Sequence, residues 1–436
     1  MIKKIEQKRQ HQNLIDVDTY TINKIRNELY PVLLAWNQEV SPKTFDIEIV
    51  FPPSHIDKDL CFSIYSLGKL LRLSPQIIGT TVASKINEAK LIFVQHAEYL
   101  NGYINLTLSS SLVCQDVITI IQLHEENYGQ SNINEGKLVI IDYSAPNIAK
   151  PIGIGHLRST IIGHTLANIY SMTGYTAIRD NQLGDWGTQF GALLYAYNQW
   201  GNENELKTDP IKKLKDLYVR FHEAATLDAT LMDKARDYFK RLEEKDPSLI
   251  SLWQKFRELS INEFSKIYSL LGIDFDLYIG ESFYVNKANQ AIEDAINKNI
   301  ARTEDGLETV IVDSLPGIPS FLLRKQDGSS LYLTRDLATI KYRIETFHPE
   351  TILFVVGGEQ ELHFKQVFCL SDKMGYSSDS KLKHISFGLI LQDGKKMSTR
   401  KGSLVELEDV LNFAIEKSKE VLENRRWEKS QITSID

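Results

Sequence analysis

The segment from residue 137 to residue 170 constrains the fold more than any other part of the sequence. It begins with the apolar run Lys137-Leu-Val-Ile-Ile-Asp142, which is short enough for a buried parallel strand. The loop Tyr143-Ser-Ala-Pro-Asn-Ile-Ala-Lys-Pro-Ile-Gly-Ile-Gly-His-Leu-Arg-Ser159 follows, and apolar residues then recur at helical spacing over residues 160–170. A strand, a tight loop and a helix in this order aim free backbone N–H groups at an anion. The segment therefore predicts a phosphate-binding loop.

Four residues of this loop are candidates for contact with phosphate. Gly153 and Gly155 let the backbone come close to a ligand, while His156 and Lys150 can offer positive charge. The loop fits neither the Walker pattern nor the glycine pattern of dinucleotide-binding proteins. It therefore predicts a phosphate site of another kind.

Composition narrows the class of protein. A chain of 436 residues is too long for one ordinary hydrophobic core, so we expect two or three domains. The formal net charge of −7 argues against a protein that coats nucleic acid indiscriminately, but it is compatible with a local basic face. We expect no membrane segment, because no apolar run has the length of a bilayer. Three widely spaced cysteines without a metal-type pair indicate a reduced, cytoplasmic setting.

The sequence after residue 137 favours a parallel sheet interrupted by an insertion. Strand-like runs lie at 137–143, 177–180 and 351–356, and residues 210–270 between them have helical periodicity. We predict six regions: an N-terminal domain (1–120), a linker (121–136), the first half of a catalytic domain (137–192), a mainly helical insertion (193–325), the second half (326–402), and a connecting helix with a tail (403–436).

A second loop, Asp393-Gly-Lys-Lys-Met-Ser-Thr-Arg-Lys-Gly402, is the other candidate phosphate site. It places four cations in a short stretch between two glycines: Lys395, Lys396, Arg400 and Lys401. Such a loop suits a polyphosphate whose charge must be neutralised during transfer. Taken alone, the loop is equally compatible with a solvated basic turn.

The two loops together resemble the signature motifs of class I aminoacyl-tRNA synthetases. Gly153-Ile-Gly-His156 is similar to the His-x-Gly-His motif, and Lys396-Met-Ser-Thr-Arg400 is similar to the Lys-Met-Ser-Lys-Ser motif. Further stretches resemble arginyl-tRNA synthetases in particular: Ser144-Ala-Pro-Asn-Ile-Ala-Lys-Pro151, Asn181-Gln-Leu-Gly-Asp-Trp-Gly-Thr-Gln-Phe-Gly191, Tyr332-Leu-Thr-Arg-Asp-Leu-Ala338 and Gly358-Glu-Gln-Glu-Leu-His-Phe-Lys-Gln366. Ser66-Leu-Gly-Lys-Leu-Leu-Arg-Leu-Ser-Pro75 and Gly102-Tyr-Ile-Asn-Leu-Thr-Leu-Ser109 resemble the additional N-terminal domain of that family.

The resemblance implies an α/β fold: a Rossmann-like parallel sheet with a helical insertion, preceded by a small α+β domain. It implies a binding site for the arginine side chain and its α-amino and carboxylate ends, formed by Asn147, Glu281, Tyr332, Asp336 and Gln360. ATP would be bound by Gly153, Gly155, His156, Lys396, Met397 and Ser398. The catalytic charge would come from His156, Lys150, Lys395 and Lys396.

The chemistry implied by the resemblance has two steps. ATP activates L-arginine to arginyl-adenylate, and the tRNA 3′ end then takes the arginyl group. We therefore expect ATP with Mg²⁺ as a substrate, the metal being held chiefly by the phosphates and by no dedicated protein site. The expected partners are tRNA, L-arginine and ATP, with no membrane, and we expect a monomer.

Two features depart from the pattern of the family. Gly153 stands where the first histidine of its motif is expected, and Thr399 stands where the second lysine is expected. Only residues 403–436 follow Gly402, which is too little for the helical anticodon-binding domain of these enzymes. These departures leave two alternatives open: a weak or inactive relative that binds arginine, ATP or tRNA, and a ligase that activates arginine for another acceptor.

The stretch Gly184-Asp-Trp-Gly187 also allows two interpretations. It belongs to the arginyl-type stretch at 181–191, so Asp185 and Trp186 are candidates for a role in the site. A tight turn with a packed indole ring would produce the same four residues. The sequence does not decide between them.

Overall fold

The structure, a computed structural model, describes residue 5 and residues 14–304, 308–326, 328, 331–392, 395–396 and 405–432. The chain divides into two compact units. One comprises His11–Glu135 with Met172–Gly174, and the other comprises Met1–Gln10, Gly136–Ser171 and Tyr175–Asp436. The finer division into six functional regions stays a prediction.

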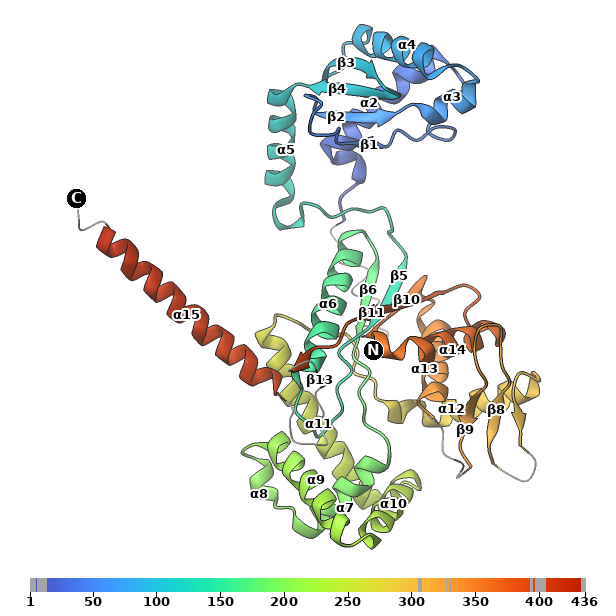
Figure 1. Cartoon of the computed structure of the whole chain (residues 1–436), viewed down its shortest axis with the longest axis vertical. Coiled ribbons are helices and arrows are strands. Elements are labelled where there is room, and N and C mark those ends of the chain that lie inside the picture. Colours follow the sequence, from blue (N-terminus) through green and yellow to red (C-terminus); the bar gives the residue numbers. More distant parts are fainter. Residues whose placement is uncertain are drawn as a thin grey trace. The chain divides into compact units, whose positions relative to one another are not determined.

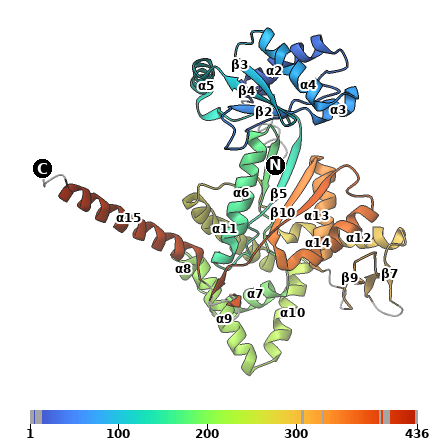
Figure 2. The ribbon, with the colours of Figure 1, turned by 45° about the horizontal axis from the view of Figure 1, so that its top comes forward.

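The N-terminal unit combines an antiparallel sheet with helices, which agrees with the small α+β domain expected before the parallel sheet. Its four strands run in the order β1-β2-β4-β3: β1 (Ile49–Val50), β2 (Leu60–Ser63), β4 (Tyr103–Leu108) and β3 (Val94–Leu100). Its helices are η1 (Val17–Thr19), α2 (Thr21–Trp36), α3 (Tyr65–Leu71), α4 (Pro75–Glu88), α5 (Ser110–His124) and η2 (Glu125–Asn127). Helices α2 and α4 enclose its core with the sheet (Figure 2).

Local sequence explains how this unit turns and starts its helices. Asn101 and Gly102 both have positive φ and join β3 to β4, as a tight hairpin of right-handed strands requires. Helix α4 begins at Ser74, whose side chain accepts from the N–H of Ile77, and Pro75 takes the first helical position.

The second unit is built on a four-stranded parallel sheet, as predicted. Its order is β11-β10-β5-β6, and every neighbouring pair is parallel. The strands are β5 (Leu138–Asp142), β6 (Thr176–Asp180), β10 (Thr351–Gly357) and β11 (Lys381–Phe387), so the three predicted strands are confirmed. Helix α6 (Leu157–Met172) connects β5 to β6, and α14 (Glu361–Lys373) connects β10 to β11. This is the Rossmann-like arrangement that the sequence indicated.

Alternate residues of the strands pack into two separate cores. Leu138 and Ile140 of β5 face the side of α12 (Val285–Asn297), α13 (Tyr332–Phe347) and α14. Val139 and Ile141 face the other side, where α6 lies (Figure 1). All four side chains are buried, which explains why β5 is a continuous apolar run rather than an alternating one.

The insertion after β6 is mainly helical, as predicted. Its helices are α7 (Thr188–Trp200), α8 (Glu203–Leu206), α9 (Pro210–Leu227), α10 (Thr230–Glu243) and α11 (Pro247–Leu270). Helices α9 and α11 each start with an aspartate cap followed by proline, at Asp209 and Asp246. The one-turn helix η4 (Glu281–Tyr284) then leads into α12. A three-stranded antiparallel sheet, which the sequence did not indicate, follows: β7 (Arg302–Thr303), β8 (Val310–Val312) and β9 (Phe321–Arg324).

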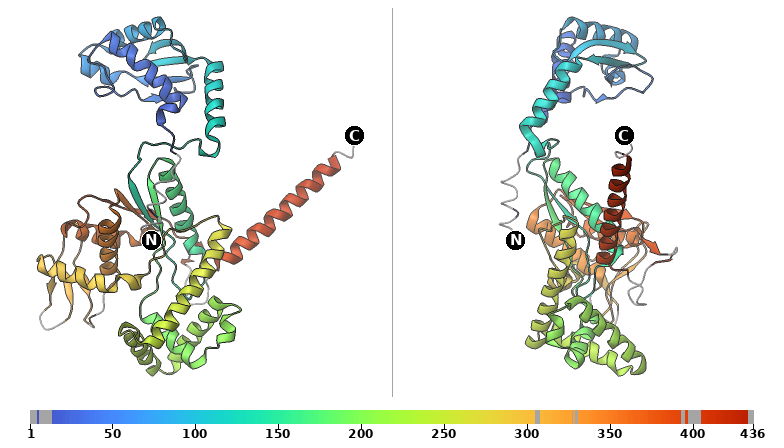
Figure 3. Two further views of the ribbon diagram at one scale, coloured as in Figure 1. Left: turned by 180° about the vertical axis from the view of Figure 1, so that it is seen from behind. Right: turned by 90° about the vertical axis from the view of Figure 1, so that its left-hand side faces the viewer.

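The chain after β11 forms a short antiparallel pair and a long helix. The pair is β12 (Leu391–Gln392) with β13 (Lys395–Lys396), and the helix is α15 (Leu407–Ile432), which confirms that the last predicted region, residues 403–436, contains a helix (Figure 3). Phe413 and Leu422 of α15 are largely exposed. Among the described residues, none of the helices combines the length and the apolar character that crossing a bilayer would need.

A buried guanidinium joins α13 to the sheet. Arg343 is 0% exposed and lies between two aspartates that end adjacent strands, Asp142 on β5 and Asp180 on β6. Its Nη2 lies 2.8 Å from Oδ2 of each, and its Nε donates to Asp180 at 3.0 Å. Burial raises the pKa of Asp180 to about 6, although the charge of Arg343 opposes that rise.

We expect Arg343→Met to destabilise the second unit by about 3–5 kcal/mol at pH 7, because it leaves two buried carboxylates without a counter-charge. A carboxyl whose folded pKa is raised favours the folded state below its unfolded pKa and loses that contribution as pH rises through about 6. The loss should therefore be smaller at pH 5 than at pH 7. Urea denaturation at both pH values measures it.

The control adds Asp142→Asn and Asp180→Asn to Arg343→Met. Because the cost comes from uncompensated charge, the triple variant should recover part of the stability at pH 7. Equal stability of wild type and Arg343→Met at pH 7 would contradict this role of Arg343.

Candidate active site

The candidate site lies at the carboxyl ends of the parallel strands. From β5 the chain crosses to β6 on one side of the sheet, and β10 pairs with β5 on its other side. The loops after β5 and β10 therefore diverge at a switch point, where open α/β sheets bind their ligands. The predicted residues Asn147 and Gln360 follow these two strands, and both are exposed.

The loop after β5 is held by a network of backbone pairing and hydroxyl groups. The N–H of Ile148 donates to the carbonyl of Gly184 at 3.1 Å, and Asn147 forms a parallel bridge with Gly184. The N–H of Ser144 donates to Oγ of Ser159 at 2.9 Å, and that hydroxyl donates to the carbonyl of Val355 on β10 at 2.7 Å. The loop is thus fixed to α6, to β10 and to the chain that follows β6.

The predicted phosphate-binding residues lie at the start of α6. The turn η3 (Ile154–His156) leads directly into the helix, and Nδ1 of His156 lies 3.2 Å from the carbonyl oxygen of Gly153. Burial lowers the pKa of His156. The lowered pKa favours the neutral imidazole, which can offer a phosphate an N–H group. A Cβ on Gly155 would have no atom within 4 Å, so open space lies in front of it.

The segments just before and just after the second signature loop are hydrogen-bonded to the first loop or to α6. Before it, Nη1 of Arg158 on α6 donates to the carbonyl oxygens of Gly388 and Leu389. After it, the N–H of Ile154 donates to the carbonyl of Val405 at 3.0 Å. The N–H of Leu407 donates to Ile152 at 2.8 Å, and Gly153 bridges Glu406. The residues that flank the second loop are therefore bound to the first loop and its helix.

The second loop itself is described only in part. Lys395 and Lys396 form β13, and Met397 and Ser398 lie outside the described residues. Lys150, the other predicted cation, lies toward the insertion. Its Nζ donates to Oε1 of Gln189 at 3.0 Å and lies 4.6 Å from the ring centre of Tyr218.

Three residues predicted for the arginine side chain meet at one end of α13. Tyr332 begins that helix, Asp336 follows one turn later, and Glu281 begins η4. Oε2 of Glu281 lies 3.1 Å from Nε of Arg335, and the guanidinium carbon of Arg335 lies 4.7 Å from the ring centre of Tyr332. Burial raises the pKa of Glu281 to about 7, Arg335 opposes the rise, and the charges of Asp336 and Asp185 add to it.

Asp336 is held by two further side chains. Nε2 of His363 on α14 lies 2.7 Å from its Oδ2, and Nε2 of Gln182 donates to its Oδ1 at 3.4 Å. Gln182 also accepts from Nη2 of Arg343 at 3.2 Å. The buried Arg343 cluster is thus connected to the candidate arginine site through one glutamine.

Asp185 fixes the segment that carries Glu281. It is buried, and its carboxylate accepts from the N–H of Ser282 at 2.8 Å and from the Ser282 hydroxyl at 2.9 Å. Nε of Arg257 lies 3.2 Å from the same carboxylate. The indole of Trp186 packs edge-to-face against Trp253 at 5.8 Å between ring centres. Asp185 therefore positions the neighbour of Glu281, while Trp186 packs as the turn interpretation expected.

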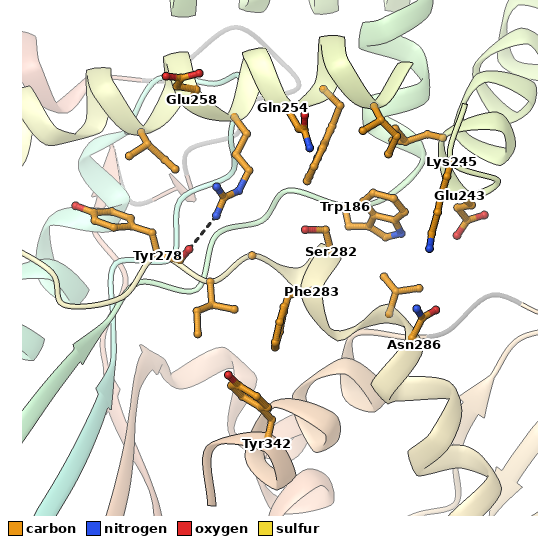
Figure 4. A pocket seen from close by; sticks show the side chains of 18 of the residues that line it. Trp186, Glu243, Lys245, Gln254, Glu258, Tyr278, Ser282, Phe283, Asn286 and Tyr342 are labelled. Carbon is orange, nitrogen blue, oxygen red and sulfur yellow. Dashed lines mark hydrogen bonds between the residues drawn. The ribbon is translucent and has the colours of Figure 1, made fainter. Parts of the chain in front are cut away.

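A pocket of about 830 Å³ lies on the other side of this segment, between α11, η4 and α13. Trp186, Phe283 and Tyr342 are among the residues that line it (Figure 4). Arg257 also lines it and donates to the carbonyl oxygen of Tyr278 at 2.8 Å. Since its lining omits Glu281 and Asp336, the pocket is separate from the predicted arginine site.

The structure adds residues that the sequence analysis did not single out. Arg335 and His363 both lie inside stretches that were recognised, but no pattern showed that they contact Glu281 and Asp336. Arg343 lies outside those stretches. The aspartates that end β5 and β6 gave the available signal, since the carboxyl ends of adjacent parallel strands meet at one edge.

Comparison with known proteins agrees with this geometry. Residues 117–436 match the family described as tRNA synthetases class I (R), catalytic domain. The chain belongs to the class I arginyl-tRNA synthetase family. It is 44% identical over 374 residues to the arginine–tRNA ligase of Exiguobacterium sibiricum and 41% identical over 377 residues to that of Clostridium perfringens. Each match covers 86% of this chain and 66% of the relative, so the chain spans just under two thirds of their length.

A solved structure has the same fold. The arginyl-tRNA synthetase of Plasmodium falciparum superposes with a TM-score of 0.68 at 24% identity, covering 94% of this chain and 70% of that one. At this identity the likeness concerns the fold alone. The predicted fold class is confirmed, while the roles of the individual site residues stay predictions.

We expect Gly280→Ala to destabilise the second unit by about 1–3 kcal/mol, because its new Cβ would lie 1.8 Å from Oδ2 of Asp185. The carboxylate would have to move, which would disturb the hydrogen bonds that it accepts from Ser282. Gly155→Ala is the matched control, since its Cβ has open space. Urea denaturation compares the two. Equal stability of the two variants would show that the hydrogen bonds from Ser282 to Asp185 tolerate a displaced carboxylate.

Proposed function

We propose that the chain is an arginine–tRNA ligase, which uses ATP to activate L-arginine and transfers the arginyl group to tRNA. The relatives that bear this name are 41–44% identical over most of the chain. The observation that carries the proposal is the paired carboxylates of Glu281 and Asp336, beside the exposed ring of Tyr332. A permanently charged, planar guanidinium is best held by carboxylates and an aromatic face.

ATP is the proposed second substrate, with Mg²⁺ bound mainly to its phosphates. The start of α6 supports this, because its free N–H groups and the open space in front of Gly155 suit an anion. The neutral imidazole of His156 would donate a hydrogen bond to a phosphate oxygen. The cations of the second loop, Lys395 and Lys396 among them, would neutralise charge on the phosphates as it develops.

The proposed reaction proceeds by two displacements. A carboxylate oxygen of arginine attacks the α-phosphorus of ATP, and the bond to pyrophosphate breaks. The 3′-terminal hydroxyl of tRNA then attacks the carbonyl carbon of the adenylate, and AMP leaves. Asn147 and Gln360, at the ends of neighbouring strands, are proposed to hold the α-amino and carboxylate groups of arginine. The contribution of the chain is chiefly positioning and fixed charge.

Arginine-dependent exchange between pyrophosphate and ATP tests the proposal. We expect exchange in the presence of arginine and tRNA, none with lysine in place of arginine, and labelled arginine on the tRNA. Activation in this family typically needs tRNA, so the assay is run with and without it. Absence of exchange both with and without tRNA would contradict the proposal that the chain is an enzyme. Exchange that leaves the tRNA uncharged would indicate a different acceptor. Weak exchange would indicate that the glycine at position 153 limits the rate of activation.

The affinity for arginine should fall as pH decreases through 7. Only the ionised carboxylate of Glu281 attracts a guanidinium, and its pKa of about 7 leaves it largely protonated at pH 6. We expect an apparent Kd for L-arginine about tenfold weaker at pH 6 than at pH 8, measured by isothermal titration calorimetry. Glu281→Gln should remove the dependence. The control Glu416→Gln, on exposed α15, should retain it.

A further inference from the structure

Arg335 lies inside the candidate arginine site and contacts two of its three predicted side-chain groups. Its side chain is only 9% exposed, whereas Tyr332, over whose ring it lies, is 62% exposed. Its Nε faces Oε2 of Glu281 at 3.1 Å. The chain thus places a guanidinium of its own next to the carboxylate predicted to bind one.

The contact uses one oxygen of Glu281 and leaves the other. Within the described residues, Oε1 of Glu281 makes no hydrogen bond or ion pair, and the side chain is 15% exposed. One carboxylate can accept from two guanidinium groups, because its two oxygens have about four lone-pair sites. Arg335 and a bound arginine can therefore share Glu281 without exclusion.

Charge balance also requires a partner for Glu281. Asp336 lies close enough to Glu281 for its charge to disfavour that of Glu281, and the buried Asp185 adds to the effect. Asp185 has its own cation in Arg257, and the imidazole Nε2 of His363 lies 2.7 Å from Asp336. Arg335 is the cation that faces Glu281. Without it, the pKa of this largely buried carboxylate would rise further, and the group would be almost wholly protonated at neutral pH.

We propose that Arg335 is a positioning residue for the amino acid: it holds Glu281 charged and aimed at the guanidinium of the substrate. This inference rests on the proposed function, because it assumes that the site binds arginine. It differs from self-occupation, in which Arg335 would fill the place of the substrate and have to leave. If Arg335 left Glu281, its buried guanidinium would lose its counter-charge, which is costly.

The test measures binding of L-arginine to the full chain by calorimetry from pH 6 to pH 9. For Arg335→Gln we expect binding at pH 7 to weaken at least about tenfold, and the midpoint of the pH dependence to rise by at least about one pH unit. At pH 9 much of the affinity should return, because Glu281 is then ionised. Arg335→Lys, which keeps the charge, should keep the midpoint near that of wild type.

Arg302→Gln is the matched control, since Arg302 forms an exposed ion pair with Asp313. It should bind arginine as wild type does. Tighter binding by Arg335→Gln, or by Arg335→Lys should the glutamine variant fail to fold, would overturn the proposal in favour of self-occupation. An unchanged midpoint in Arg335→Gln would overturn it as well. Absence of arginine binding by wild type at every pH would instead contradict the proposed function.

Discussion

The burial of Arg343 between Asp142 and Asp180 is the interaction on which the rest of the site depends. It joins a helix that comes late in the chain to the carboxyl ends of two early strands. Asp336 lies seven residues before Arg343, two helical turns away and on the same face of α13. The buried Arg343 therefore fixes the position of α13, and with it the positions of Asp336 and Arg335 relative to the residues of other elements that they contact.

The same arrangement of charges recurs around the site. Asp180 pairs with Arg343, Asp185 with Arg257, and Glu281 with Arg335, and in each pair the arginine comes from a helix distant in sequence. Burial raises the pKa of all three carboxyls. Each arginine thus opposes the rise in the pKa of a buried acid, and each acid holds a helix in place. Of the three acids, Glu281 is the one predicted to bind a ligand.

Periodicity and loop chemistry were enough to predict the strands at 137–143 and 351–356, since such runs are local. The Arg343 cluster could not be predicted, because its partners lie 163 and 201 residues away and no local pattern connects them. The lowered pKa of His156 could not be predicted either, for a related reason. Its pKa depends on burial by the folded chain, which the motif alone does not reveal.

The joined flanks of the two signature loops explain how a weakened motif can still serve one site. Gly153 lacks the imidazole expected there, yet its backbone bridges Glu406 beside the end of the second loop. Arg158 contacts the other flank through Gly388 and Leu389. Because both flanks are bound to the first loop and to α6, the strand β13 (Lys395–Lys396) lies in the chain between two segments that are fixed near the start of α6. We propose that cations of the second loop supply the charge missing at Gly153.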